Sequence, residues 1–119
     1  MDGFTQIKNV LIDEEMPNLS GAAFKILILI ARQTVGWVED SEKGTRKQKD
    51  WMSHSQLVSR TGHAKATITK AIKELVDRKL ILVSDTGGNI LQESSDRRGK
   101  SKLFYEINFA DLSRKWNAF

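Results

Sequence analysis

The clearest periodic pattern in the chain lies in its middle, where apolar residues recur at helical spacing. The positions i, i+3, i+4, i+7 and i+8 are occupied by Ile68, Ala71, Ile72, Leu75 and Val76. This spacing places them on one side of an amphipathic helix. Before this helix, Ser53 is followed three residues later by Gln56, which is the pattern of a capping box. We therefore predict two helices joined by a short turn at residues 61–63.

Two further helices are expected in the first third of the chain. Asn9 is a candidate N-cap for a short helix that runs to Met16 and ends at Pro17. Ser20 opens a longer helix that runs to about Val35 and ends at Gly36. Residues 24–30 are almost continuously apolar and would also suit a strand. The length of the whole segment favours a helix.

The pattern changes to β character after Lys79. Residues 80–83 and 103–107 are rich in β-forming side chains, and they flank a polar, glycine-containing span at 84–101. They predict a hairpin with an extended tip. Trp51 and Met52 could form a short strand stub. The polar stretch between Trp37 and Asp50 is expected to be an exposed loop.

This order of elements predicts a winged helix-turn-helix: mainly α, with a small β-hairpin as the wing. We assign residues 1–19 to an N-terminal arm with a short helix, 20–109 to the winged helix-turn-helix domain and 110–119 to a C-terminal tail. In the tail, Trp116 or Phe119 is expected to pack on the domain, unless the end frays.

Charge is unevenly distributed along the chain. In total, 19 Lys and Arg oppose 15 Asp and Glu, for a net charge of +4. Residues 1–45 hold four basic and seven acidic side chains, a net −3, so residues 46–119 carry +7. This division suggests a side that faces a polyanion. An uneven solvated surface is the alternative that charge alone leaves open.

The helix-turn-helix and the basic excess together predict binding to double-stranded DNA. We expect Ala66, Thr67 and Lys70 near base edges in the major groove and Lys73 on a phosphate. The wing would supply cations for phosphates or a narrow minor groove. The predicted contacts are Lys65, Ala66, Thr67, Thr69, Lys70 and Lys73 on the helix, Arg97, Arg98, Lys100 and Lys102 in the wing, and Ser53, Ser55, Lys47 and Lys49 toward the DNA backbone.

Other classes of function find little support in the sequence. There is no cysteine, which excludes disulfides, thiolate zinc sites and cysteine nucleophiles. No phosphate-binding glycine motif or nucleophile elbow is present, and the two histidines suggest no metal set. We expect no catalysis, no cofactor and no metal. No apolar run is long enough for a membrane span and no signal peptide is evident, so a cytoplasmic, nucleoid-associated location is expected.

The histidines and tryptophans receive structural interpretations. His63 in the turn is expected to cap or pack, and His54 to face solvent in the first turn of its helix. Trp37, Trp51 and Trp116 are expected to be core and strand anchors rather than base-stacking platforms.

Two segments resemble the bacteriophage replication protein O family. That family has a Phe-x-x-Ile-x-Asn opening and a helix that ends in Arg-x-Thr-x-Gly-Trp. The matching residues here are Phe4, Ile7 and Asn9, then Arg32, Thr34, Gly36 and Trp37. Its helix-turn-helix is matched by Ser53, Gln56, Leu57, Thr61, Gly62, Ala71, Ile72 and Leu75. The resemblance covers roughly residues 3–108.

The resemblance implies a DNA-binding domain of a phage-type or plasmid-type replication initiator. Such domains bind repeated origin sequences as dimers or arrays, so a homodimer on DNA is possible. A helicase or loader would be recruited only by a C-terminal region that this chain is too short to include. Two alternatives stay open: a winged-helix transcriptional regulator, and a winged helix that serves protein interaction without DNA.

Overall fold

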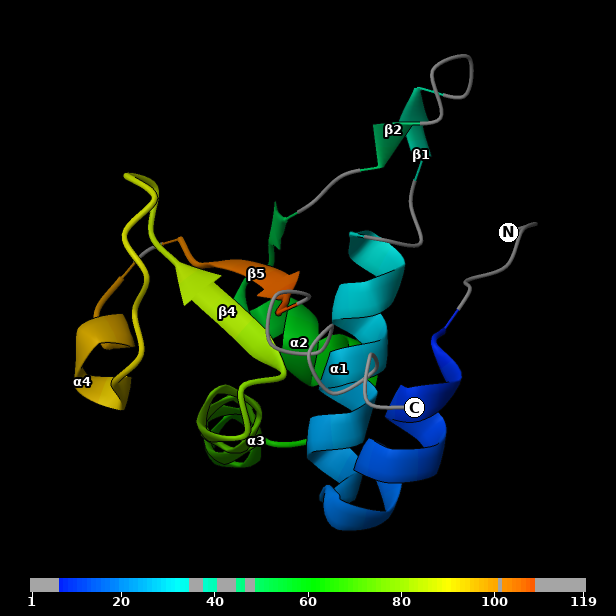
Figure 1. Ribbon diagram of the computed structural model, residues 1–119. Coiled ribbons are helices and arrows are strands. Elements are labelled where there is room, and N and C mark those ends of the chain that lie inside the picture. The colour runs from blue at the N-terminus through cyan, green and yellow to red at the C-terminus, as the bar shows by residue number, and fades with distance from the viewer. Residues whose placement is uncertain (1–6, 35–37, 41–44, 47–48, 101, 109–119) are drawn as a thin grey trace.

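Helix α1 lies at the centre of the fold, and the other elements pack around it (Figure 1). The computed structural model describes residues 7–34, 38–40, 45–46, 49–100 and 102–108. In chain order the elements are η1 (Leu11–Glu15), η2 (Met16–Asn18), α1 (Gly21–Gln33), β1 (Val38–Asp40), β2 (Thr45–Arg46), β3 (Asp50–Trp51), α2 (His54–Thr61), α3 (Lys65–Asp77), β4 (Ile81–Ser84), α4 (Ser94–Arg97) and β5 (Phe104–Ile107).

The sequence of α1 accounts for its position. The predicted cap is confirmed, because the Ser20 hydroxyl accepts a hydrogen bond of 3.1 Å from the backbone N–H of Ala23. Ile26, Leu27 and Ile30 are fully buried, as expected of a helix that is apolar on most of its surface. The helix ends at Gln33, two residues before the predicted end, while Gly36 lies outside the described residues.

Helices α2 and α3 form the two-helix unit that the sequence predicts. Ser53 and Gln56 make both hydrogen bonds of the capping box, at 3.1 and 3.0 Å. Helix α2 ends at Thr61 and is followed by Gly62, whose φ of 78° lies in the left-handed region that glycine adopts without strain. The Lys25 ammonium of α1 donates to the carbonyl oxygen of Thr61 at 3.2 Å, which fixes the end of α2 against the core helix.

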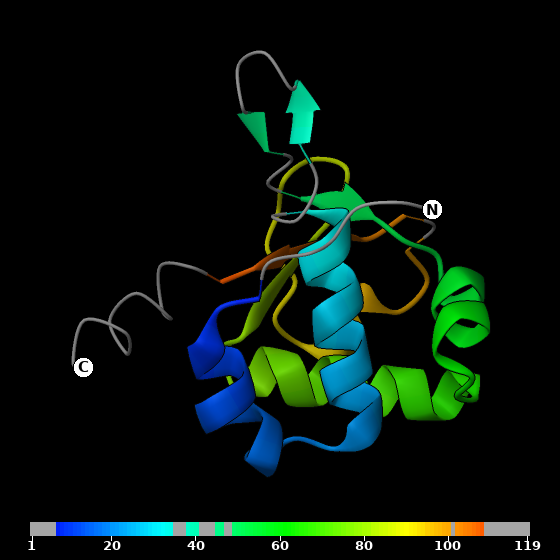
Figure 2. The same ribbon diagram turned by 90° about the vertical axis from the view of Figure 1, so that its right-hand side faces the viewer.

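The apolar stripe of α3 faces the core as predicted. Ile68, Ala71, Ile72 and Leu75 are buried, and Val76 is partly buried. Helix α1 crosses α3 (Figure 2), and the carboxylate of Glu74 accepts a hydrogen bond of 2.9 Å from the backbone N–H of Ser20. The opposite side of α3 is consequently left to solvent.

The sheet has three antiparallel strands in the order β3-β5-β4. Tyr105, at the centre of β5, pairs with Val83 on one side and Asp50 on the other. Tyr105 and Ile107 face the core, whereas Phe104 points to the opposite face because side chains alternate along a strand. The predicted stub at 51–52 is therefore the edge strand β3, one residue earlier.

The wing between β4 and β5 contains more structure than the extended tip that the sequence predicts. The chain turns back at residues 85–89, so that the N–H of Leu91 reaches the carbonyl oxygen of Val83 at 2.8 Å. The short helix α4 then precedes β5. Leu91 and Leu103 are both 7% exposed, and these two residues anchor the wing to the core.

The described part of the predicted N-terminal arm packs on the same core. Leu11 is 3% exposed, and Ile7, Val10 and Leu19 pack against the core cluster. Helical backbone runs from residue 9 to 18, first as a π-helical turn and then as a 3₁₀ turn. Pro17 therefore does not end the helix as predicted. It lies within the first two residues of the 3₁₀ turn, where a proline needs no N–H donor.

Two short strands lie in a segment that the sequence assigned to a loop. Within residues 37–50, β1 and β2 pair as an antiparallel ribbon, where the sequence indicated an exposed loop. A hairpin of charged residues has no apolar alternation and so gives no strand signal. The predicted C-terminal tail, with Trp116 and Phe119, lies outside the described residues.

The predicted class, mainly α with a small antiparallel sheet, is confirmed. The order helix, strand, helix, helix, strand, wing, strand is consistent with a winged helix-turn-helix. Within the described ranges, no helix is long and apolar enough to cross a membrane.

Candidate nucleic-acid interface

The exposed side of α3 carries most of the predicted base contacts. Lys65, Ala66, Thr69, Lys70 and Lys73 are exposed, and Thr67 is half-buried. The N-cap, Ala64, makes no side-chain hydrogen bond to the helix. No cap side chain therefore accepts a hydrogen bond from the first backbone N–H groups of α3.

Lys70 and Lys73 differ in their surroundings. The Lys73 ammonium lies 2.6 Å from the Asp77 carboxylate, with side chains 60% and 56% exposed. Such a surface pair adds little stability and exchanges readily for another anion. Among the described residues, Lys70 has no ion-pair partner, so its charge is available without competition.

An open cavity of about 480 Å³ lies between the start of α2, the first half of α3 and the wing. Its apolar part consists of Met52, Ile72 and Leu103. The polar and basic lining is Ser53, His54, Lys65, Thr69, Ser94, Arg97, Arg98, Gly99 and Lys100. No Asp or Glu is among these twelve lining residues.

This cavity brings together predicted contacts from three separate segments. Ser53 comes from the start of α2, Lys65 and Thr69 from α3, and Arg98 and Lys100 from the wing. The sequence could not show this convergence, because it depends on where the wing folds back. The result is a concave, cationic surface beside the exposed side of α3, suited to an anionic backbone.

His54 also lines the cavity, which corrects the expectation that it faces solvent. It is half-buried, and its Nδ1 is shielded from solvent without a hydrogen-bond partner in the described part of the chain. Burial lowers the pKa of His54 below its usual 6.5, and the nearby Lys65 charge lowers it further. His54 therefore adds a neutral, polar ring to the cavity wall near neutral pH.

Arg97 has a structural role that the sequence did not reveal. It is only 9% exposed, and its guanidinium donates to the carbonyl oxygens of Leu91 and Gln92 at 2.8 and 2.9 Å and to the Ser94 hydroxyl at 3.2 Å. These bonds close the wing around α4. Three of its five N–H donors are thus used inside the protein, so we assign Arg97 first to the structure of the wing rather than to a phosphate contact.

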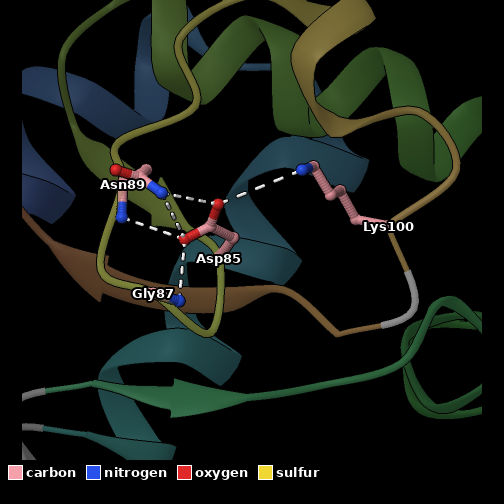
Figure 3. A network of polar contacts seen from close by, with 4 residues as sticks. All are labelled: Asp85, Gly87, Asn89 and Lys100. Atoms are coloured by element: carbon pink, nitrogen blue, oxygen red, sulfur yellow. Dashed lines mark hydrogen bonds and ion pairs between the residues drawn. The ribbon is translucent and has the colours of Figure 1, made fainter.

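A polar network fixes the turn of the wing (Figure 3). The Asp85 carboxylate accepts hydrogen bonds of 2.9 Å from the backbone N–H groups of Gly87 and Asn89, and the Asn89 amide nitrogen adds two longer ones. These bonds, first of all that from the Asn89 side chain, lower the pKa of Asp85. The Lys100 ammonium lies 4.0 Å from the same carboxylate, which links the turn to the segment after α4.

The remaining predicted contacts that the structure describes do not line this cavity. Lys102 and Lys49 lie over the rings of Trp51 and Phe104 on the outer face of the sheet, at 4.7 and 5.9 Å from the ring centroids. Trp51 is 41% exposed, so it anchors a strand but does not enter the core. Ser55 is exposed on α2, and Lys47 lies outside the described residues, as do Trp37 and Phe4.

In the described ranges, no group of three His, Cys, Asp or Glu side chains could hold a metal ion. The turn residue His63 is half-buried, and its backbone N–H donates to the Thr61 hydroxyl at 3.2 Å, in agreement with a packing role.

Comparison with known proteins defines the family. The model of the family "Bacteriophage replication protein O" matches residues 1–94, which include α1, α2, α3 and β4. Neither a curated protein nor a solved structure matches the chain significantly. The chain belongs to the bacteriophage replication protein O family, and this membership supports a role in the initiation of phage DNA replication.

Proposed function

We propose that this chain binds double-stranded DNA sequence-specifically and recognises a replication origin. The observation that carries the proposal is the convergence of Lys65, Arg98 and Lys100 on one acid-free cavity beside the exposed side of α3. Binding, without catalysis or a cofactor, is the role that we assign to this surface.

The proposed roles follow from position. Ala66, Thr67 and Lys70, in the first half of α3, would meet base edges when α3 enters the major groove end-on. The uncapped N–H groups of α3, with Lys65, Arg98 and Lys100, would hold backbone phosphates on either side of that groove. Lys73 would exchange Asp77 for a phosphate.

A second candidate is transcriptional regulation, which would use the same contacts at a promoter. The family membership favours replication. A winged helix that binds only proteins is less well supported by the cationic cavity, and it would show negligible affinity for duplex and little dependence on salt. A homodimer on DNA, cytoplasmic action and recruitment of a helicase or loader by a further region belong to the proposal as well.

The test is selection of bound fragments from a fragmented phage and host genome, followed by sequencing. Tandem repeats near a replication gene would support origin recognition. A single palindrome at a promoter would favour the regulator, and no enrichment over input would overturn sequence-specific binding.

Lys70→Ala supplies the matched variant for this test. It should weaken binding to the selected repeat by about 1–3 kcal/mol if Lys70 reads a base. Lys79→Asn serves as the control, because Lys79 is exposed beyond α3 at a positive φ of 61°, which Asn tolerates. This control should bind as the unmodified chain does.

A further inference from the structure

We propose that the outer face of the three-stranded sheet binds single-stranded nucleic acid. This aromatic–lysine face consists of Trp51 and Phe104 with Lys49 and Lys102. The proposal does not depend on duplex binding by α3.

The two aromatic rings form a cross-strand pair. Trp51 on β3 is the register partner of Phe104 on β5, and directly opposite side chains on one face lie close enough to form one surface. Trp51 is 41% exposed and Phe104 is half-buried, whereas the neighbouring Tyr105 points into the core. Part of the aromatic surface is therefore accessible, on a strand whose other side is fixed in the core.

Two exposed ammonium groups lie over these rings. Lys102 Nζ is 4.7 Å from the centre of the Trp51 ring, and Lys49 Nζ is 5.9 Å from that of Phe104. Cation–π contacts at exposed sites are weaker than the stacking of a base on an aromatic ring. A base can therefore take the place of each ammonium on its ring, and the freed lysine can reach the adjacent phosphate.

The aromatic–lysine face should bind unpaired rather than paired bases. Bases in a duplex are stacked on their neighbours and offer no free face to a ring, whereas every unpaired base does. Glu106 lies on the same side of β5, two residues beyond Phe104, and it is half-buried. The two exposed lysines outnumber this carboxylate, so the face keeps a positive charge.

This face is separate from the proposed duplex surface. The apolar stripe of α3 and Tyr105 on the inner side of β5 belong to the same buried core, whereas Phe104 lies on the opposite side of the sheet. None of the four residues of the aromatic–lysine face lines the cavity. One molecule could hold duplex and single strand together.

The experiment measures binding of fluorescein-labelled oligo(dT) and oligo(rU) to the whole chain by anisotropy. Trp51→Ala should weaken oligo(dT) binding by roughly 5- to 150-fold, which corresponds to about 1–3 kcal/mol for one lost stacking contact. Duplex binding should not change. Ile12→Ala is the matched control, because Ile12 is 39% exposed in η1, outside the sheet.

Unchanged oligo(dT) binding by Trp51→Ala, with the fold intact by circular dichroism, would overturn the proposal. So would a loss of oligo(dT) binding with Lys70→Ala as large as its loss of duplex binding, because the strand would then lie on α3. Equal competition by poly-glutamate would also overturn it, by indicating an acidic protein segment as the occupant. If these tests support the site, comparison of oligo(dT) with oligo(rU) shows whether the site prefers single-stranded DNA or RNA.

Discussion

The ionisation of Tyr105, a buried side chain of the sheet, is coupled to the stability of the core. It is fully buried at the centre of β5, and its hydroxyl has no hydrogen-bond partner in the part of the chain that the structure describes. Burial raises the pKa of Tyr105 from 10.0 to about 12, against a smaller opposing effect of Arg97. Because the unfolded chain releases this proton earlier, the contribution of Tyr105 to the free energy of unfolding is complete below pH 10 and declines as the pH rises toward 12.

The chain has a single tyrosine, so ultraviolet titration of phenolate absorbance follows Tyr105 alone. We expect its ionisation to coincide with unfolding rather than to precede it. Tyr105→Phe should abolish the signal and raise the free energy of unfolding by about 1 kcal/mol, because an unsatisfied buried hydroxyl is removed. A loss of stability in this variant would mean that the hydroxyl is hydrogen-bonded in solution.

A second prediction at this scale concerns His54. Its lowered pKa means that the folded state resists protonation, by burial first and by Lys65 second. The unfolded state binds the proton first as the pH falls below 6.5, so the free energy of unfolding should decrease from there toward the folded pKa. Denaturant unfolding at a series of pH values between about 7.5 and 5, the range in which a histidine titrates, measures this decrease.

Two variants test the assigned cause. Lys65→Ala should move the His54 pKa upward in a nuclear magnetic resonance titration of the ring, though not fully to 6.5, because burial remains. His54→Gln should make the stability decrease smaller over the same pH range. An unchanged profile in His54→Gln would assign the pH dependence to another group.

Among the elements, helices α1, α2 and α3 were predictable, whereas the end of the N-terminal helix, the β1–β2 ribbon and the folding of the wing were not. Capping at Ser20 and Ser53, the Gly62 stop and the stripe from Ile68 to Leu75 are local signals, and all are confirmed. The folded wing depends on contacts between segments: Arg97 with the carbonyl of Leu91, and Asp85 with Lys100. An arginine in a polar span has the same sequence signature whether it faces solvent or closes a turn.

The candidate site was also predictable only where local sequence signals determine it. Sequence located the basic side of α3, because helical periodicity determines which residues are exposed. It did not reveal that His54 joins the cavity or that Lys49 and Lys102 lie on the far side of the sheet. Those placements depend on tertiary packing, which no short window of sequence contains.

The turn at Asp85 offers an element-scale prediction. Asp85→Ala removes the acceptor of both backbone N–H groups at Gly87 and Asn89, so their hydrogen exchange should accelerate. Asp85→Asn is the matched variant, because its amide oxygen can still accept from the turn while the attraction to Lys100 is lost. We expect fast hydrogen exchange in the alanine variant and nearly normal exchange in the asparagine variant. Equally fast exchange in both variants would mean that the attraction between Asp85 and Lys100, and not the hydrogen bonds of the turn, holds the wing.

For the whole molecule, the distribution of charge determines how binding depends on salt. The net +7 of residues 46–119 includes Lys65, Arg98 and Lys100 around one cavity. Each phosphate that such a cation neutralises releases counterions and adds about 0.9 to the slope of log affinity against log salt concentration. The double variant Arg98→Ala/Lys100→Ala should therefore reduce this slope by about 1.8, on specific and random duplex alike.

Arg97→Ala tests, in the same measurement, whether the slope depends on phosphate contacts or on the total charge of the chain. Arg97→Ala removes one formal charge as well, but that guanidinium is committed to the carbonyls of Leu91 and Gln92. It should lower stability and leave the slope of the folded protein almost unchanged. If Arg97→Ala flattened the slope as much as Arg98→Ala, the wing would rearrange on DNA to release Arg97, and the phosphate contact first expected from the sequence would be restored.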